Sequence, residues 1–149
     1  MEVNIFNFMK ILVVHGPNLN QTGFREKNQY GEKTLEQIND DIIKFSKENH
    51  IFTEIFQSNN EGQIIDKLET SKNVIDGLII NPGAYSHYSY AIRDAIAALN
   101  FPAIEVHMSN IYNREDFRQK SVIAPVCVGQ ISGFKEYSYI LAMQAFLFK

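Results

Sequence analysis

The segment KILVVHGPNLN, residues 10–20, indicates the fold, because an apolar run passes directly into a sharply turning polar loop. An apolar run of this kind is typical of a strand that is covered on both faces by helices. The same step from apolar run to polar loop returns near residues 56, 80 and 106. Helical patterns separate these runs, and strands that alternate with helices indicate a parallel sheet.

The order of these segments predicts an α/β fold of the flavodoxin-like type, a three-layer sandwich with a five-stranded parallel sheet. The expected strands cover residues 10–14, 51–56, 77–80, 103–106 and 122–132. The first expected helix begins at a capping box formed by Thr34 and Gln37. The other expected helical segments cover residues 63–71, 88–100, 114–119 and 136–148.

Length and composition are those of one ordinary globular domain, since the chain has 149 residues of which 45% are hydrophobic and 21% charged. We expect residues 9–149 to form a single domain and residues 1–8 to be an N-terminal extension. The net charge of −3 argues against a broad nucleic-acid surface, which needs clustered basic residues. The single cysteine, Cys127, lies between valines and has no disulfide partner, which fits a reducing compartment.

Neither a secretory signal nor a bilayer-spanning segment is expected. The opening MEVNIFNFMK lacks a basic start followed by an uninterrupted apolar run. Elsewhere no apolar stretch is long enough to cross a membrane. We therefore predict a cytoplasmic protein that binds neither membranes nor nucleic acid.

Polar side chains gather just after the predicted strands, where parallel strands present their carboxyl ends at one edge of the sheet. Ligands of open α/β sheets bind outside that edge. The residues concerned are Asn18, Asn81, His87, Glu105 and His107. The connection of residues 21–31 is long and polar, and long loops in compact domains are usually lids or binding loops. The sequence therefore predicts one ligand site with a lid.

Glu105 and His107 fall on the same side of a strand because of its period of two, so the carboxylate can orient the imidazole. A satisfied polar pair at a strand end explains the same pattern. His87 opens a helix, where the helix dipole favours a neutral ring, or it is a capping or surface histidine. Asn18 and Asn81 suit a bound hydroxyl or a developing oxyanion, or they stabilise turns.

Tyr30 is a candidate base only if a cation lies beside it. A phenol has a pKa of about 10 and is protonated at neutral pH, whereas a nearby guanidinium such as that of Arg25 favours the phenolate. Arg25, Arg114 and Arg118 are also candidates for gripping a carboxylate, although most arginines simply face solvent. Packing before Gly31 is the alternative role of the tyrosine.

Read together, these motifs resemble the type II 3-dehydroquinate dehydratases. The resemblance runs in order along residues 9–149 and rests on GPNLN at 16–20, GxR at 23–25, YG at 30–31, NxEG at 59–62, NPGAxSH at 81–87, EVH at 105–107 and the pair Arg114 and Arg118. It implies a flavodoxin-like catalytic domain, no metal or organic cofactor, and a homododecamer built as a tetramer of trimers. The activity it implies is the anti elimination of water from 3-dehydroquinate to 3-dehydroshikimate, a step of aromatic amino acid biosynthesis.

The resemblance also implies catalytic roles. Tyr30, kept ionised by Arg25, removes a proton from the carbon beside the ketone and forms an enolate. Asn18 positions a water molecule and stabilises this enolate. The departing hydroxyl is protonated by His87 or His107, and the NPGAxSH motif favours His87.

Further positions match residues that bind or orient the substrate. Glu105 orients the hydrogen-bond network, and Asp94 on the third main helix matches a residue that reaches into a neighbouring subunit's site. Taken alone, Asp94 would be a solvated charge. The remaining matched substrate-binding positions are Asn81, His87, His107, Met108, Ser109 and Arg118.

Two rival hypotheses use the same strand ends. A flavin-binding or phospho-receiver module would be a non-enzymatic relative of the fold, but Pro17 and Leu19 stand where a phosphate loop needs glycines and hydroxyls, and Asn81 stands where a receiver needs an aspartate. A metal-dependent hydrolase could use His15 with His87, His107 and Glu105.

Overall fold

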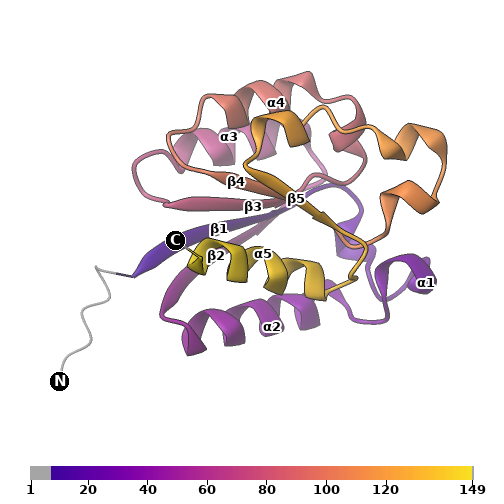
Figure 1. Ribbon diagram of the computed structural model, residues 1–149, viewed down its shortest axis with the longest axis horizontal. Coiled ribbons are helices and arrows are strands. Elements are labelled where there is room, and N and C mark those ends of the chain that lie inside the picture. The colour runs from indigo at the N-terminus through magenta and orange to yellow at the C-terminus, as the bar shows by residue number, and fades with distance from the viewer. Residues whose placement is uncertain (1–7, 149) are drawn as a thin grey trace.

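The computed structural model describes residues 8–148, and it is built around one five-stranded parallel sheet with the strand order β2-β1-β3-β4-β5 (Figure 1). Four parallel pairings connect the strands in this order. The carboxyl ends of all five strands therefore meet at one edge. The strands are β1 (Met9–His15), β2 (Ile51–Gln57), β3 (Gly77–Asn81), β4 (Ala103–His107) and β5 (Gly129–Ser132).

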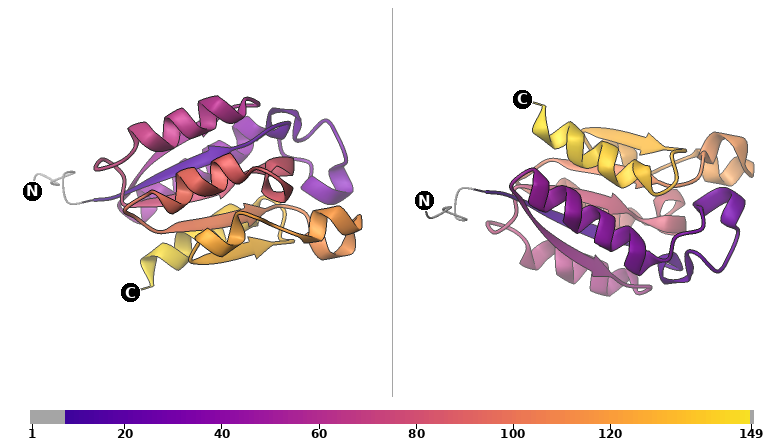
Figure 2. Two further views of the ribbon diagram at one scale, coloured as in Figure 1. Left: turned by 90° about the horizontal axis from the view of Figure 1, so that it is seen from above. Right: turned by 90° about the horizontal axis from the view of Figure 1, so that it is seen from below.

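Helices cover both faces of the sheet, with α2 and α5 on one side and α3 and α4 on the other (Figures 1 and 2). The short helix α1 lies apart from these layers, at the end of the molecule where the strands terminate. The three-layer α/β prediction is thus confirmed. The helices are α1 (Lys27–Tyr30), α2 (Leu35–Glu48), α3 (Glu61–Thr70), α4 (Tyr90–Ala97) and α5 (Tyr137–Leu147).

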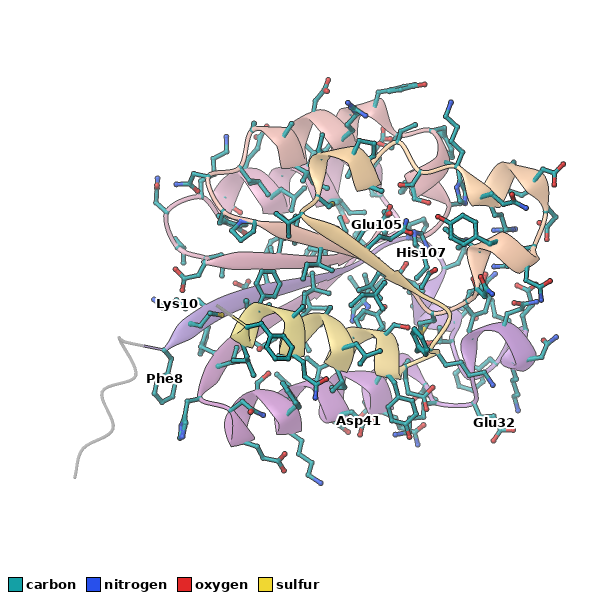
Figure 3. All side chains as sticks on the ribbon, viewed as in Figure 1. Phe8, Lys10, Glu32, Asp41, Glu105 and His107 are labelled. Atoms are coloured by element: carbon teal, nitrogen blue, oxygen red, sulfur yellow. The ribbon has the colours of Figure 1, made fainter. Side chains whose placement is uncertain are left out.

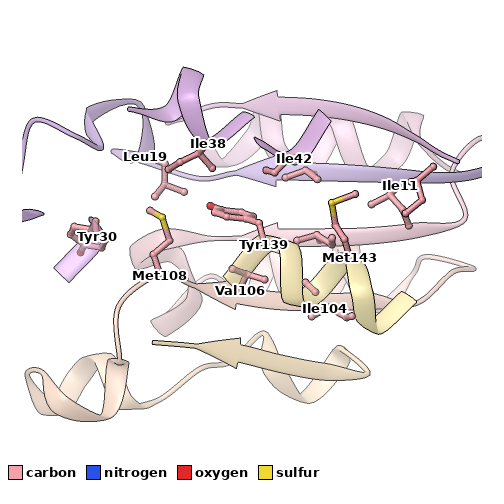
Figure 4. Close-up of a cluster of buried hydrophobic side chains, with 14 residues drawn as sticks. Ile11, Leu19, Tyr30, Ile38, Ile42, Ile104, Val106, Met108, Tyr139 and Met143 are labelled. Atoms are coloured by element: carbon pink, nitrogen blue, oxygen red, sulfur yellow. The ribbon is translucent and has the colours of Figure 1, made fainter. Parts of the chain in front are cut away.

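Two hydrophobic cores follow from the alternation of side chains along β1. Ile11 and Val13 face α2 and α5, whereas Leu12 and Val14 face α3 and α4, and all four are fully buried. Figure 4 shows the first core, in which α5 contributes Tyr139 and α2 contributes isoleucines. Burial on both faces explains why the strand reads as continuously apolar.

Helix α2 begins at the predicted capping box. The Oγ1 of Thr34 accepts the N–H of Gln37 at 3.2 Å, and the Oε1 of Gln37 accepts the N–H of Thr34 at 3.0 Å. Both contacts satisfy N–H groups that a helix start would otherwise leave unpaired. Ser89 caps α4 through one bond, in which its hydroxyl accepts the N–H of Ile92, and that helix therefore begins later than the predicted residue 88.

The predicted strand over residues 122–132 is wrong in its first part, since β5 covers only Gly129–Ser132. The hydroxyl of Ser121 accepts the N–H groups of Ile123 and Ala124, and this turn leads into a short 3-10 helix at Ala124–Val126. Val122 and Ile123 are buried against the α3 and α4 core without joining the sheet. Apolar composition alone therefore did not separate a buried loop from a strand.

The predicted N-terminal extension, residues 1–8, lies outside the described residues except for Phe8. Within residues 8–148, no helix is long and apolar enough to cross a membrane.

Candidate active site

A pocket lies beyond the carboxyl ends of β1, β3 and β4, where α1 and the segment after β4 come together (Figures 1 and 2). Its position is the one expected for a ligand site in an open α/β sheet. Most predicted site residues line it. These are Asn18, Arg25, Tyr30, Asn81, His87, His107, Met108, Ser109 and Arg118, together with Arg114.

The loops after β1 and β3 are locked to each other beside the pocket. The N–H of Gly16 donates to the carbonyl of Asn81 at 2.7 Å, and a Cβ on Gly16 would lie only 2.7 Å from the backbone of Pro82. No residue but glycine fits this approach. Asn18 follows with a φ of 66°, in the left-handed region, and its N–H donates to Asn59 Oδ1 at 2.9 Å.

Asn81 ends β3 and is almost completely buried, with 3% of its surface exposed. Its Oδ1 accepts the N–H of Gly83 at 3.1 Å. Since a backbone N–H can only donate, this contact fixes which end of the carboxamide is oxygen. The NH₂ group accordingly donates to the hydroxyl of Tyr139 at 2.9 Å.

Glu105 and His107 form the predicted pair at the end of β4 (Figure 3). The Nε2 of His107 lies 3.4 Å from Oε1 of Glu105, within ion-pair range, although the geometry is not that of a hydrogen bond. Ser121 donates to Oε1 at 2.7 Å and Gln130 donates to Oε2. Burial alone would raise the pKa of Glu105, but His107 and these donors outweigh it and hold the pKa below its usual range. The carboxylate is therefore charged at neutral pH.

His87 lies across from His107, with nearly parallel rings at 6.5 Å between centroids. Its Nδ1 is 2.8 Å from the carbonyl of Lys120, so Nδ1 carries a hydrogen and Nε2 is the free nitrogen of the neutral ring. Burial, with smaller effects of the His107 and Arg118 charges, lowers the pKa of His87 despite the Lys120 contact. The neutral form is thereby favoured.

Tyr30 is buried at the end of α1, and cations surround its ring. The Nη1 of Arg114 donates to the phenolic oxygen at 2.7 Å and to Ser109 Oγ at 3.2 Å. The guanidinium of Arg25 lies over the ring, 4.7 Å from its centroid. Because the Arg114 side chain is only 5% exposed, water screens its charge little.

The segment over residues 21–31 carries both Arg25 and Tyr30 into the pocket. Glu26 connects this segment to Arg114, which lies after β4. One carboxylate oxygen of Glu26 is 3.6 Å from Nη1 of Arg25, and the other is 3.6 Å from Nη2 of Arg114. The Nε of Arg25 is buried and has no hydrogen-bond partner among the described residues. Arg25 lines the pocket and thus keeps an unused hydrogen-bond donor.

Comparison with known proteins assigns the chain to a family, and the groups in this pocket agree with that family. The family Dehydroquinase class II matches residues 9–147. The chain belongs to the class II dehydroquinase family.

Relatives within this family are similar over almost their full lengths. A 3-dehydroquinate dehydratase of Caldicellulosiruptor saccharolyticus is 58% identical over 137 residues, which cover 91% of this chain and 94% of the relative. One from Nitratiruptor sp. is 56% identical, with 92% and 88% covered. The type II dehydroquinase structure from Butyrivibrio crossotus superposes with a TM-score of 0.92 at 51% identity, with 94% and 98% covered.

The structure adds one detail to the expected placement of the dehydroquinase residues and leaves another untested. Arg114, which sequence reasoning offered only as a carboxylate ligand, contacts the Tyr30 oxygen directly, whereas Arg25 lies over the ring. Its spacing of four residues from Arg118 was the signal available in the sequence. Asp94 is exposed on α4 and does not line the pocket, so its role toward a neighbouring subunit stays a prediction.

The metal-hydrolase hypothesis is not favoured by the family or by the position of His15. That ring is fully buried and bonds to Tyr139 and Asn39 on the α2 and α5 side of the sheet. Among residues 8–148, no cluster of three or more histidine, cysteine, aspartate or glutamate side chains is arranged to hold a metal ion.

Proposed function

We propose that this class II dehydroquinase removes water from 3-dehydroquinate to give 3-dehydroshikimate in the shikimate pathway, with Tyr30 as the base. The observation that carries the proposal is the 2.7 Å contact between Arg114 and the Tyr30 oxygen, made in the same pocket as the Glu105 and His107 pair. The same pocket thus holds a base next to a guanidinium group and an acid next to a carboxylate.

The first step is removal of a proton from the carbon beside the ketone. Arg114 donates to the phenolic oxygen and Arg25 lies over the ring, so two guanidinium groups lie next to the proposed base. The proton moves to the phenolate oxygen and the electron pair moves to the ketone oxygen, forming an enolate. Asn18 stabilises this enolate through a positioned water molecule, as neutral donors do for developing oxyanions.

The second step is departure of the hydroxyl group as water, with a histidine as proton donor. The NPGAxSH motif favours His87 for this role, but the electrostatics favour His107. The charged Glu105 carboxylate lies 3.4 Å from Nε2 of His107 and can orient that ring, whereas burial favours the neutral form of His87. We therefore assign the acid to His107, oriented by Glu105, and substrate binding to His87.

Substrate orientation comes from the remaining groups around the pocket. Asn81 binds a substrate hydroxyl, and the backbone of Met108 and Ser109 binds the carboxylate. Arg118, whose Nε also contacts Glu115 at 2.7 Å, holds a ring hydroxyl. No cofactor is required for these steps.

We also propose a cytoplasmic homododecamer, a tetramer of trimers in which Asp94 reaches a neighbouring site. Support comes from the family resemblance and from aromatic side chains that are more than half exposed near α4 and the pocket rim, namely Tyr88, Tyr90, Tyr112 and Phe117. Light scattering should give a mass about twelve times the 17.1 kDa of the chain. A mass of one chain would contradict this assembly.

The test of the mechanism separates the two steps in deuterated water. Ultraviolet absorbance follows the conjugated product, and proton NMR of the remaining substrate follows deuterium entry at the carbon beside the ketone. Tyr30→Phe should lower the rates of both product formation and deuterium exchange by about 100-fold or more, as expected when a general base is removed. His107→Asn should keep deuterium exchange and lose dehydration.

His87→Asn decides the acid assignment. If His87 only binds substrate, this variant raises KM and keeps both deuterium exchange and dehydration. Loss of dehydration in His87→Asn alone would transfer the acid role to His87. Tyr137→Phe and His50→Asn replace exposed residues and are the matched controls.

A further inference from the structure

We propose that Tyr139 is a positioning residue, which together with His15 and Asn39 fixes the orientation of the Asn81 carboxamide in the pocket. The proposal rests on the proposed function, because Asn81 is assigned there to bind substrate. None of the three residues lines the pocket. They lie behind it, between the sheet and the helices α2 and α5.

A continuous row of hydrogen bonds leads from the pocket into the protein. The Nδ2 of Asn81 is 2.9 Å from the hydroxyl of Tyr139, which is 2.9 Å from Nδ1 of His15. The Nε2 of His15 is in turn 2.8 Å from Oδ1 of Asn39 on α2. The His15 and Tyr139 rings meet edge to face with centroids 5.0 Å apart, which leaves little room for either to turn.

The direction of every bond in the row is determined from the pocket end. The Gly83 N–H requires the oxygen of Asn81 on its side, so Asn81 presents its NH₂ group to Tyr139. The phenolic oxygen accepts that hydrogen, and its own hydrogen is then donated to Nδ1 of His15. His15 must therefore carry its hydrogen on Nε2, where the oxygen of Asn39 accepts it.

Burial makes this arrangement hard to replace. His15 and Tyr139 are 0% exposed, so water does not offer alternative partners. Burial lowers the pKa of His15 to about 4 against a smaller opposing effect of Asn39, and burial raises the pKa of Tyr139. Both groups stay neutral, and a neutral row has only this one consistent set of donors and acceptors.

Loss of the Tyr139 hydroxyl would leave a buried N–H of Asn81 without its partner. An unpaired buried donor is costly, and the carboxamide would gain from turning toward another acceptor. Asn81 lines the pocket, so its other N–H would turn with it. Substrate binding should weaken while the base and acid remain in place.

Solid-state nitrogen NMR of histidine-labelled protein tests the row directly, with His15→Asn used to assign the signal. Wild-type protein should show His15 as the single tautomer with hydrogen on Nε2, and Tyr139→Phe should show a mixture. A wild-type His15 with its hydrogen on Nδ1 would overturn the proposal. This readout needs no substrate, so it stands even if 3-dehydroquinate is not turned over and the proposed function fails.

Kinetics with 3-dehydroquinate test the consequence for the site. Tyr139→Phe should raise KM about five- to tenfold, the fold-change that corresponds to one buried hydrogen bond, and change kcat less than about twofold. Tyr137→Phe makes the same substitution at an exposed position of α5 and should change neither. Destabilisation alone would lower the apparent kcat at constant KM, and that result would refute the positioning role. If Tyr139→Phe does not fold, the tautomer of His15 in the wild-type protein still tests the proposal.

Discussion

At the scale of single residues, each proposed catalytic group is set by a neighbour of a different kind. Arg114 contacts the oxygen of Tyr30 from 84 positions further along the chain. Glu105, by contrast, lies two positions from His107 on the same strand. The pair within one strand follows from the period of two. The contact between distant positions follows only from the folded arrangement of two loops.

Asn59 should control the reactivity of Asn18. Asn18 has a left-handed backbone, which asparagine tolerates better than most residues, and the 2.9 Å bond from its N–H to Asn59 Oδ1 holds the residue in place. Asn59→Ala should therefore lower kcat about tenfold, as loss of roughly 1.4 kcal/mol of positioning would do. Steady-state kinetics with 3-dehydroquinate provide the measurement. Asn100→Ala, at an exposed asparagine, is the control, and equal kcat values in the two variants would disprove the role.

Removal of the Glu105 charge should narrow the pH range of catalysis. Glu105 has a pKa held below its usual range, so it is ionised throughout neutral pH and places a negative charge 3.4 Å from Nε2 of His107. In Glu105→Gln the alkaline decline of kcat should begin at a lower pH, because the proton donor has lost its counter-charge. The measurement is the pH profile of kcat from pH 5 to 10. An unchanged alkaline limb would mean that Glu105 does not support the acid.

At the scale of elements, the ends of helices and strands position the site more than their middles do. Helix α2 carries Asn39, and its start is fixed by the reciprocal bonds of Thr34 and Gln37. Strand β4 ends at His107, with Met108 and Ser109 immediately after it. Small shifts at these ends would move the groups that face the pocket.

The Thr34 cap should contribute measurably to stability. Thr34→Ala removes the oxygen that accepts the Gln37 N–H, and loss of such a cap costs about 1 kcal/mol of unfolding free energy. Urea denaturation at fixed protein concentration gives this difference. Thr70→Ala at the exposed end of α3 is the matched control, because its hydroxyl only donates to the Lys67 carbonyl. A cap variant no less stable than this control would contradict the prediction.

Sequence patterns predicted these elements where local chemistry determines them. The capping box of Thr34 and Gln37 marked the start of α2, and the apolar runs marked the first four strands. The apolar composition of residues 122–128 predicts a strand, but only Val122 and Ile123 of this segment are buried, and they pack against α3 and α4 instead of joining the sheet. Helix α1 was not predicted, since its four residues show no period long enough to detect.

At the scale of the whole molecule, the sheet separates two hydrophobic cores. The hydrogen-bonded row from Asn81 to Asn39 crosses one of them. His15 lies in that row, fully buried, with a pKa of about 4 in the folded protein instead of 6.5. The unfolded chain takes up a proton between those values and the folded chain does not. The free energy of unfolding should therefore fall as the pH drops from 6.5 to about 4.

The contribution of His15 to this pH dependence is about 3 kcal/mol, fully present above pH 6.5. Urea denaturation at several pH values should show a shallower dependence in His15→Asn than in the wild type. His50→Asn replaces an exposed histidine, at a left-handed position that asparagine tolerates, and should keep the wild-type slope. Equal slopes for wild type and His15→Asn would show that His15 is not held neutral by the fold.

Fold class and family followed from motifs spread along the whole chain, and the pocket is lined by at least one residue of every one of these motifs except NxEG at 59–62. The row from Asn81 to Asn39 did not follow, because no local pattern links a strand end, a terminal helix and an α2 side chain. Such contacts depend on the three-dimensional packing of layers.

The proposed base and the arginine over its ring share one continuous segment, residues 21–31, whereas the proposed acid and its carboxylate lie on the sheet. Apart from Arg114, which contacts the Tyr30 oxygen from the segment after β4, the two halves of the proposed catalyst are therefore separable pieces of sequence. In a gene-shuffling experiment, residues 21–31 can be exchanged between relatives as a single segment. Such chimaeras would vary proton abstraction while leaving the fixed half of the enzyme as a common scaffold.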